Sequence, residues 1–159
     1  MPGLQGFNSA PADQLRPLLT ECLAVPGWVD AVLAARPYPD LDALAAKAEV
    51  DLSTEEILGA IAGHPRIGER AKHDGVSAKW SAAEQSGVDV SVADRLVAAN
   101  VAYEERFGHI YLVCATGLSG EEMLDDLASR MGNDPSTELR VVNGELSKIA
   151  ALRLRKAVA

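Results

Sequence analysis

The polar residue with the most unusual position in this sequence is Arg153, which continues an apolar helical stripe. Apolar residues recur on one face of an expected helix at spacings of three, four and three: Leu139, Val142, Leu146 and Ile149. The next step of four along this face reaches Arg153. A guanidinium at a core-facing position requires an anionic partner or ligand, because burying it unpaired costs roughly several kcal/mol. The alternative is a stem that lies along the surface while its charged head reaches water.

A histidine occupies a second position that could support chemistry. His64 follows Ile61 by three residues on the apolar side of an expected helix, and it precedes Pro65, whose ring restricts its backbone. Because the pKa of an imidazole lies near neutrality, His64 is a candidate general acid or base. The alternative is a helix-terminal histidine that hydrogen-bonds to the last carbonyl groups of its helix.

A carboxyl group forms the third candidate. Ser81 and Glu84 match the S-x-x-E capping box that is typical of a helix start. The functional alternative is that the Glu84 carboxyl faces His64 across a pocket. The sequence alone leaves both interpretations open.

Metal and nucleophile chemistry find little support in the sequence. His64, Glu69 and His73 do not have the spacing of ligands on one helix face, so we expect no metal site. Neither Cys22 nor Cys114 belongs to a CxxC or nucleophile motif, and no Gly-rich phosphate loop or GxSxG is present.

The composition limits the classes of partner. The chain has 159 residues, of which 48% are hydrophobic and only 4% aromatic, and its net charge is -8. This charge disfavours nucleic acid and anionic membranes as partners, so an anionic substrate must be held by local cations. Two isolated cysteines, with no secretory signal and no membrane-spanning run, predict a soluble, reduced, cytoplasmic protein.

Helix signals follow one another along the chain, which predicts an all-α fold. One domain over residues 1–159 is expected, as a compact helical bundle with a long polar loop after the fourth helix. The run 109–115 (HIYLVCA) is strand-like but has no partner strand, so it is expected to be a buried extended segment or a helix start. The expected helices are 11–24, 28–35, 41–50, one capped by Ser53 and ending before Gly63, one from about Ser81, 91–107, one from Ser119 to about Met131, and a long one from Asp134–Pro135.

Four segments taken together resemble a known family. They are GHPRIGE (63–69), WSAAEQSGV (80–88), NVAYEERFGHIYLVCATG (100–117) and ELSKIAALRL (145–154), and they occur in the family's order at comparable intervals. The family is the 2-oxo-4-hydroxy-4-carboxy-5-ureidoimidazoline (OHCU) decarboxylases of urate breakdown. The resemblance spans nearly the whole chain.

The resemblance implies a cofactor-free, all-α homodimer that converts OHCU to (S)-allantoin and releases carbon dioxide. It makes His64 and Glu84 the catalytic residues. It leaves open whether Glu84 acts as a carboxylate or as a protonated acid. The substrate contacts that it implies are Pro65, Ser81, Gln85, Tyr111, Leu112, Val113, Cys114, Ala115 and Arg153.

Two rival interpretations stay open from the sequence. One is a helical lyase or hydrolase that acts on another small anionic ureide. The other is a non-catalytic helical binding module, in which His64, Glu84 and Arg153 would not converge.

Overall fold

The backbone is helical over most of the two ranges that the computed structural model describes, residues 3–64 and 90–158. Within these ranges there is no β-strand, which confirms the all-α prediction. The helices are α1 (Gly3–Ser9), α2 (Ala12–Cys22), α3 (Pro26–Ala34), α4 (Leu41–Ala45), the 3-10 helix η1 (Ala46–Ala48), α5 (Thr54–Ile61), α7 (Val90–Phe107), α8 (Gly120–Arg130) and α9 (Pro135–Ala157).

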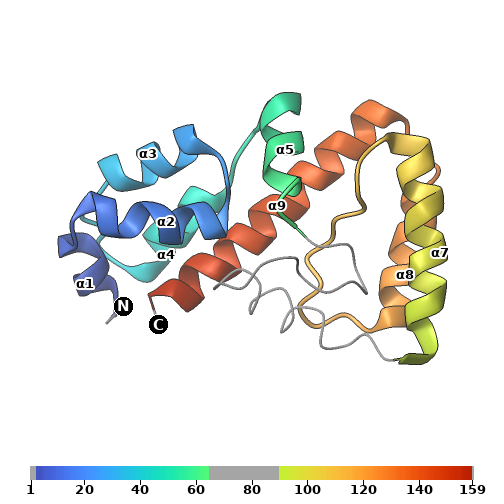
Figure 1. The fold of residues 1–159 in the computed structure, drawn as a ribbon. Helices are drawn as coiled ribbons and strands as arrows, with labels where there is room; N and C mark the ends of the chain where they lie inside the picture. The colour runs from blue at the N-terminus through green and yellow to red at the C-terminus, as the bar shows by residue number, and fades with distance from the viewer. Residues whose placement is uncertain (1–2, 65–89, 159) are drawn as a thin grey trace.

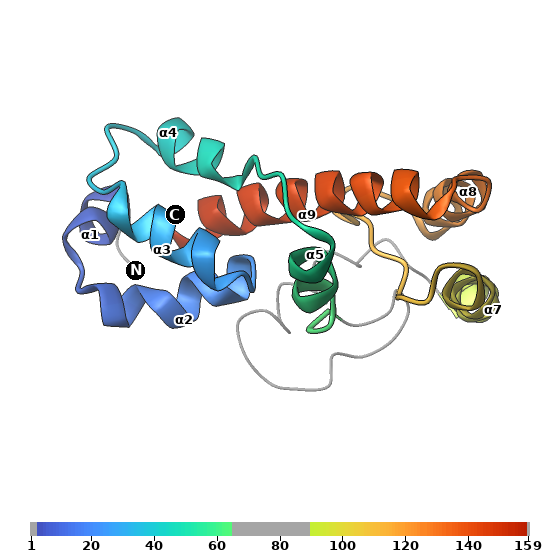
Figure 2. The same ribbon diagram turned by 90° about the horizontal axis from the view of Figure 1, so that it is seen from above.

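The long helix α9 organises the molecule. It runs from the end that holds α7 and α8 to the N-terminal helices in Figures 1 and 2, with α2, α4, η1 and α5 packed along it. Helices α7 and α8 pack against each other at the end where α9 begins. None of the helices in the described ranges is long and apolar enough to cross a membrane.

Two apolar cores result from this arrangement. The α9 core joins α9 to the N-terminal helices and includes Leu15, Leu19, Val32, Leu44, Ile57, Leu146 and Leu154. The α7–α8 core includes Val92, Leu96, Tyr103, Met123 and Leu127.

The strand-like run 109–115 lies between the two cores as a non-helical segment. Its side chains alternate, as expected of an extended backbone. Tyr111, Val113 and Ala115 pack in the α7–α8 core, whereas Leu112 packs in the α9 core. This confirms the expectation of a buried extended segment.

Local signals fix the helix starts as the sequence predicts. Ser53 with Glu56 and Ser119 with Glu122 form complete capping boxes at α5 and α8. Asp134 accepts a hydrogen bond from the Thr137 N–H at the start of α9. After α7, Gly108 adopts a φ of +80°, the left-handed conformation that ends many helices.

One helix and several boundaries differ from the predictions, among them the end of α2 at Cys22 in place of residue 24. Helix α1 was not expected, because its apolar signal is short, yet Phe7 on this helix is fully buried. Helix α3 begins at Pro26, which the first turn of a helix tolerates. The expected helix 41–50 ends at Ala48, because the Asn143 side chain binds the Val50 carbonyl (2.9 Å) and the Leu52 N–H (2.9 Å) and holds them extended.

Candidate functional site

His64 lies just beyond the end of α5, where its N–H donates to the Ile61 carbonyl (3.0 Å). Ile57, Ala60 and Ile61 anchor this helix in the α9 core, so the position of His64 is set by their packing. Burial, and after it the positive charge of Arg153, lower the pKa of His64 to about 4. His64 is therefore neutral at pH 7 and its imidazole can hydrogen-bond to a substrate oxygen, although the lowered pKa makes it a weaker base than a free imidazole.

Arg153 on α9 is buried, with 2% of its surface exposed. The prediction that it continues the apolar face of the last helix is confirmed, because Val142, Leu146 and Ile149 are buried on the same helix. Burial excludes the alternative in which its head reaches water. Its Nη1 donates to the Glu21 carbonyl at the end of α2 (2.8 Å).

Cys22 is the third group beside Arg153. Its thiol is buried, and burial raises its pKa to about 12, opposed by the charge of Arg153 and reinforced by that of Glu21. The thiol is therefore protonated at neutral pH.

The structure thus brings two of the candidate residues, His64 and Arg153, within electrostatic reach of each other where α2, α5 and α9 meet. This convergence disagrees with the non-catalytic alternative as far as these two residues are concerned. Pro65, Ser81, Glu84 and Gln85 lie outside the described residues, as do the predicted loop 65–80 and the helix expected from Ser81.

The expected substrate contacts in 111–115 are described. The side chains of Tyr111, Leu112, Val113 and Ala115 are buried in the two cores, whereas Cys114 is partly exposed.

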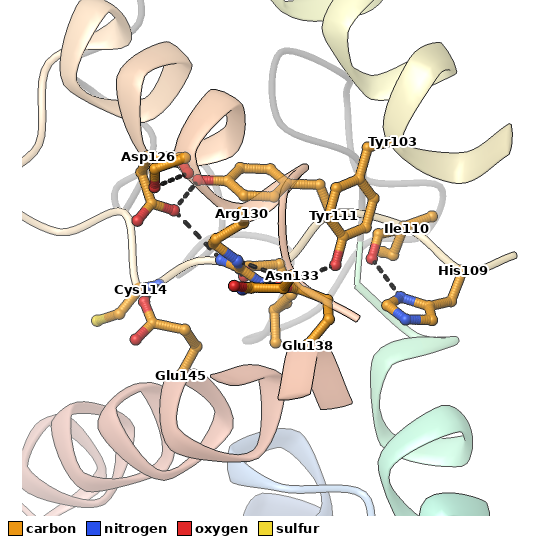
Figure 3. A network of polar contacts seen from close by, with 12 residues as sticks. Tyr103, His109, Ile110, Tyr111, Cys114, Asp126, Arg130, Asn133, Glu138 and Glu145 are labelled. Atoms are coloured by element: carbon orange, nitrogen blue, oxygen red, sulfur yellow. Dashed lines mark hydrogen bonds and ion pairs between the residues drawn. The ribbon is translucent and has the colours of Figure 1, made fainter. Parts of the chain in front are cut away.

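A buried ionic network, which the sequence analysis missed, holds this segment (Figure 3). Arg130 (4% exposed) and Glu138 (fully buried) form an ion pair, with Nη2 and Nε of Arg130 at 2.5 and 2.8 Å from Glu138 Oε2. Nη1 of Arg130 donates to the Leu112 carbonyl (2.8 Å) and to Asp126 Oδ2 (3.2 Å).

Two tyrosines complete the network. The Tyr103 hydroxyl donates to Glu138, and the Tyr111 hydroxyl donates to Asp126 Oδ2 (2.5 Å). Burial, together with these carboxylates, raises the pKa of both phenols. The guanidinium carbon of Arg130 lies 4.7 Å from the centre of the Tyr111 ring, within cation–π range.

Two opposing effects act on the pKa of Arg130. Burial lowers its pKa, but the hydrogen bonds and the charge of Glu138 outweigh burial and raise it. The sequence did contain a signal, because Met123, Leu127 and Arg130 follow at steps of four and three, the spacing that pointed to Arg153.

A second carboxylate reaches the same segment. Glu145 of α9 accepts a hydrogen bond from the Cys114 N–H (2.9 Å) and pairs with Lys148 (2.6 Å). The carboxylate of Glu145 is thus shared between the segment and the surface of α9.

Metal ligands do not gather in the part of the chain that the structure describes, where no group of three or more His, Cys, Asp or Glu could hold an ion. Of the set considered from the sequence, only His64 falls in this part.

Fold and site together define a small all-helical protein whose candidate chemistry centres on a neutral imidazole beside a buried guanidinium. The family model described as OHCU decarboxylase matches residues 8–155, and the chain belongs to this family.

Relatives named OHCU decarboxylase span most of the chain. The protein of Amia calva is 31% identical over 136 residues, which cover 80% of this chain and 78% of that protein. The protein of Haloferax volcanii is 28% identical over 156 residues, covering 95% and 93%. A crystal structure of OHCU decarboxylase in the presence of (S)-allantoin matches with a TM-score of 0.70 and 26% identity, covering 87% and 95%.

Proposed function

We propose that this chain is a carboxy-lyase that decarboxylates OHCU to (S)-allantoin in urate breakdown. The observation that carries this proposal is the family match over residues 8–155, which includes both His64 and Arg153. The solved relative that was crystallised with (S)-allantoin supports the product.

The reaction requires control of one electron pair and one proton. The bond between the ring carbon and its carboxylate breaks, carbon dioxide leaves, and the electron pair shifts into the ring towards the neighbouring carbon that bears the ureido group. The hydroxyl proton is lost as its carbon becomes a carbonyl, and the ureido-bearing carbon takes a proton on one face to give the S product. The protein must therefore orient the ring, stabilise the developing charge and deliver the proton.

The residue roles that we propose follow from charge and protonation. Arg153 binds an anionic or carbonyl oxygen of the substrate through its planar guanidinium. His64, neutral because its pKa is about 4, accepts the hydroxyl proton or polarises that oxygen. Glu84 relays a proton to the nascent carbanion.

The remaining contacts complete the proposed pocket. Ser81 and Gln85 fix the ring and its ureido group, and Pro65 lies beside the catalytic histidine. The backbone from Tyr111 to Ala115 supplies further contacts to the substrate.

The test is a kinetic assay with OHCU prepared freshly from urate, in which (S)-allantoin is followed by circular dichroism. His64→Asn and Glu84→Gln should each lower kcat by about 10²- to 10⁴-fold, the usual contribution of a positioned acid or base. Glu105→Gln, at an exposed glutamate of α7, is the control and should keep the wild-type rate. Wild-type rates in both folded site variants would refute the assigned roles, and a wild-type chain that does not accelerate the reaction would refute the function itself.

Assembly, location and domain count are part of the proposal. We infer a homodimer from the family resemblance and a cytoplasmic location from the sequence, in which Cys22 and Cys114 lie far apart and outside any CxxC motif. One domain over residues 1–159 is expected. Light scattering, cell fractionation and limited proteolysis test these three points.

A further inference from the structure

The backbone of residues 111–115 is extended, but within the described ranges no strand lies beside it. Its buried polar groups therefore depend on other partners, because an unpaired buried amide or carbonyl is costly. Two of these partners are ionised side chains, which form stronger hydrogen bonds than neutral groups do.

One anchor is Arg130, whose Nη1 holds the Leu112 carbonyl at 2.8 Å. The other is Glu145, whose Oε1 accepts from the Cys114 N–H at 2.9 Å. The anchors belong to α8 and α9, so the segment is fixed from two helices.

Arg130 also fixes the side chain that begins the segment. Its guanidinium lies against the Tyr111 ring, and it shares Asp126 with the Tyr111 hydroxyl. In Figure 3 the guanidinium lies between Asp126 and Glu138, close to the Tyr111 side chain. Glu138 in turn holds the guanidinium through two of its nitrogens.

We propose that Arg130 is a positioning residue for substrate binding, which sets the main chain of 111–115 through the Leu112 carbonyl and the Tyr111 side chain. This inference rests on the proposed function, which makes that main chain part of the substrate pocket. Glu138 and Asp126 hold the guanidinium in place, and Arg130 itself does not touch the substrate.

The planar fork of arginine is essential to this role. Arg130 addresses a carbonyl, two carboxylates and an aromatic ring at once. An ammonium group keeps the charge but not the fixed directions of the donors. Arg130→Lys therefore separates geometry from charge.

The experiment compares Arg130→Lys with a matched control. Arg36 is a partly buried arginine that also binds main-chain carbonyls, those of Phe7, Ala10 and Leu33, at the far end of the molecule. For Arg130→Lys we expect KM for OHCU to rise about tenfold or more, while kcat changes much less, because misplaced contacts weaken binding. For Arg36→Lys we expect lower stability with unchanged KM.

A second measurement does not depend on turnover. Amide hydrogen exchange over 110–116 should accelerate in Arg130→Lys and remain as in the wild type in Arg36→Lys. (S)-Allantoin, added as a probe, should protect this segment less in Arg130→Lys.

The outcomes are distinct. A purely structural arginine predicts that Arg130→Lys and Arg36→Lys both lower the melting temperature with KM and segment exchange unchanged, and this result overturns the proposal. A wild-type chain without activity on OHCU refutes the proposed function, whereas segment exchange still decides whether Arg130 positions 111–115. If Arg130→Lys does not fold, Glu138→Gln is used in its place, because it keeps an acceptor for Arg130. We then expect a smaller rise in KM and a smaller acceleration of amide exchange over 110–116.

Discussion

Arg130 and Arg153 are both buried arginines, each continuing the apolar face of its helix, but the partners that the described part of the chain gives them differ. Arg130 lies between the carboxylates of Glu138 and Asp126. Arg153 donates to the Glu21 carbonyl, and its positive charge acts on His64 and on the Cys22 thiol.

The difference shows two uses of a buried cation. The carboxylates hold Arg130 in a network that fixes main chain, and they raise its pKa despite burial. Near Arg153, burial and, after it, the positive charge of Arg153 lower the pKa of His64. The first arrangement is suited to positioning, and the second to acting on an anionic substrate.

The largest expected effect tests how much the stability of the protein depends on the buried ion pair between Arg130 and Glu138. Glu138→Ala removes the acceptor of both Arg130 and Tyr103 and leaves a buried guanidinium with less compensation. Breaking a buried pair in this way costs about 3–5 kcal/mol of unfolding free energy. Urea denaturation followed by circular dichroism measures the loss.

The control for this variant is an ion pair at the surface. Asp51, which pairs with Arg140, has 90% of its side chain exposed, so Asp51→Ala should leave stability nearly unchanged. If Glu138→Ala and Asp51→Ala lower the free energy of unfolding by equally small amounts, the buried ionic network around Arg130 does not stabilise the protein as we expect.

Much of the fold was predictable from local signals. Capping boxes at Ser53 and Ser119, the Asp134 cap and Gly108 fixed four helix ends, because these effects act within a few residues. Helix α1 and the end of the expected helix 41–50 at Ala48 were not predictable, because both depend on tertiary packing. At Ala48 the deciding contacts are the hydrogen bonds of Asn143 to residues 50 and 52.

The site was predictable in part for the same reason. The stripe that continues into Arg153 and the junction before Pro65 pointed to two residues, and in the folded chain the charge of Arg153 acts on His64. Arg130 has the same stripe signal, but its meaning depends on Glu138 and Asp126, whose approach no short-range pattern reveals. A short-range sequence pattern does not show which residues far apart in the chain come into contact.

The next expected effect concerns the Arg153 side and is seen in the pH dependence of stability. The pKa of His64 is lowered from 6.5 to about 4 in the folded chain, so the unfolded chain binds a proton first as the pH falls. The contribution of His64 to the free energy of unfolding is therefore complete above pH 6.5 and is lost as the pH falls from 6.5 to 4. At 1.36 kcal/mol per pKa unit, the whole loss is about 3 kcal/mol.

His64→Asn isolates this contribution from those of the many carboxylates. As the pH falls from 6.5 to 4, the free energy of unfolding of the wild type should decrease relative to that of the variant. A difference that is constant with pH would mean that neither burial nor the charge of Arg153 shifts the pKa of His64 in the folded chain.

The smallest of these effects concerns Arg153 itself. Arg153→Met keeps an unbranched apolar stem on the α9 face but removes the guanidinium, so the substrate loses the cation that we propose binds its anionic or carbonyl oxygen. We expect KM for OHCU to rise about 10- to 100-fold, equal to about 1.4–2.8 kcal/mol of binding free energy. Arg155→Met, two residues further along and paired at the surface with Asp42, should leave KM unchanged. An unchanged KM in folded Arg153→Met would make Arg153 a purely structural cation, and the contrast between an arginine that positions main chain and one that binds substrate would no longer hold.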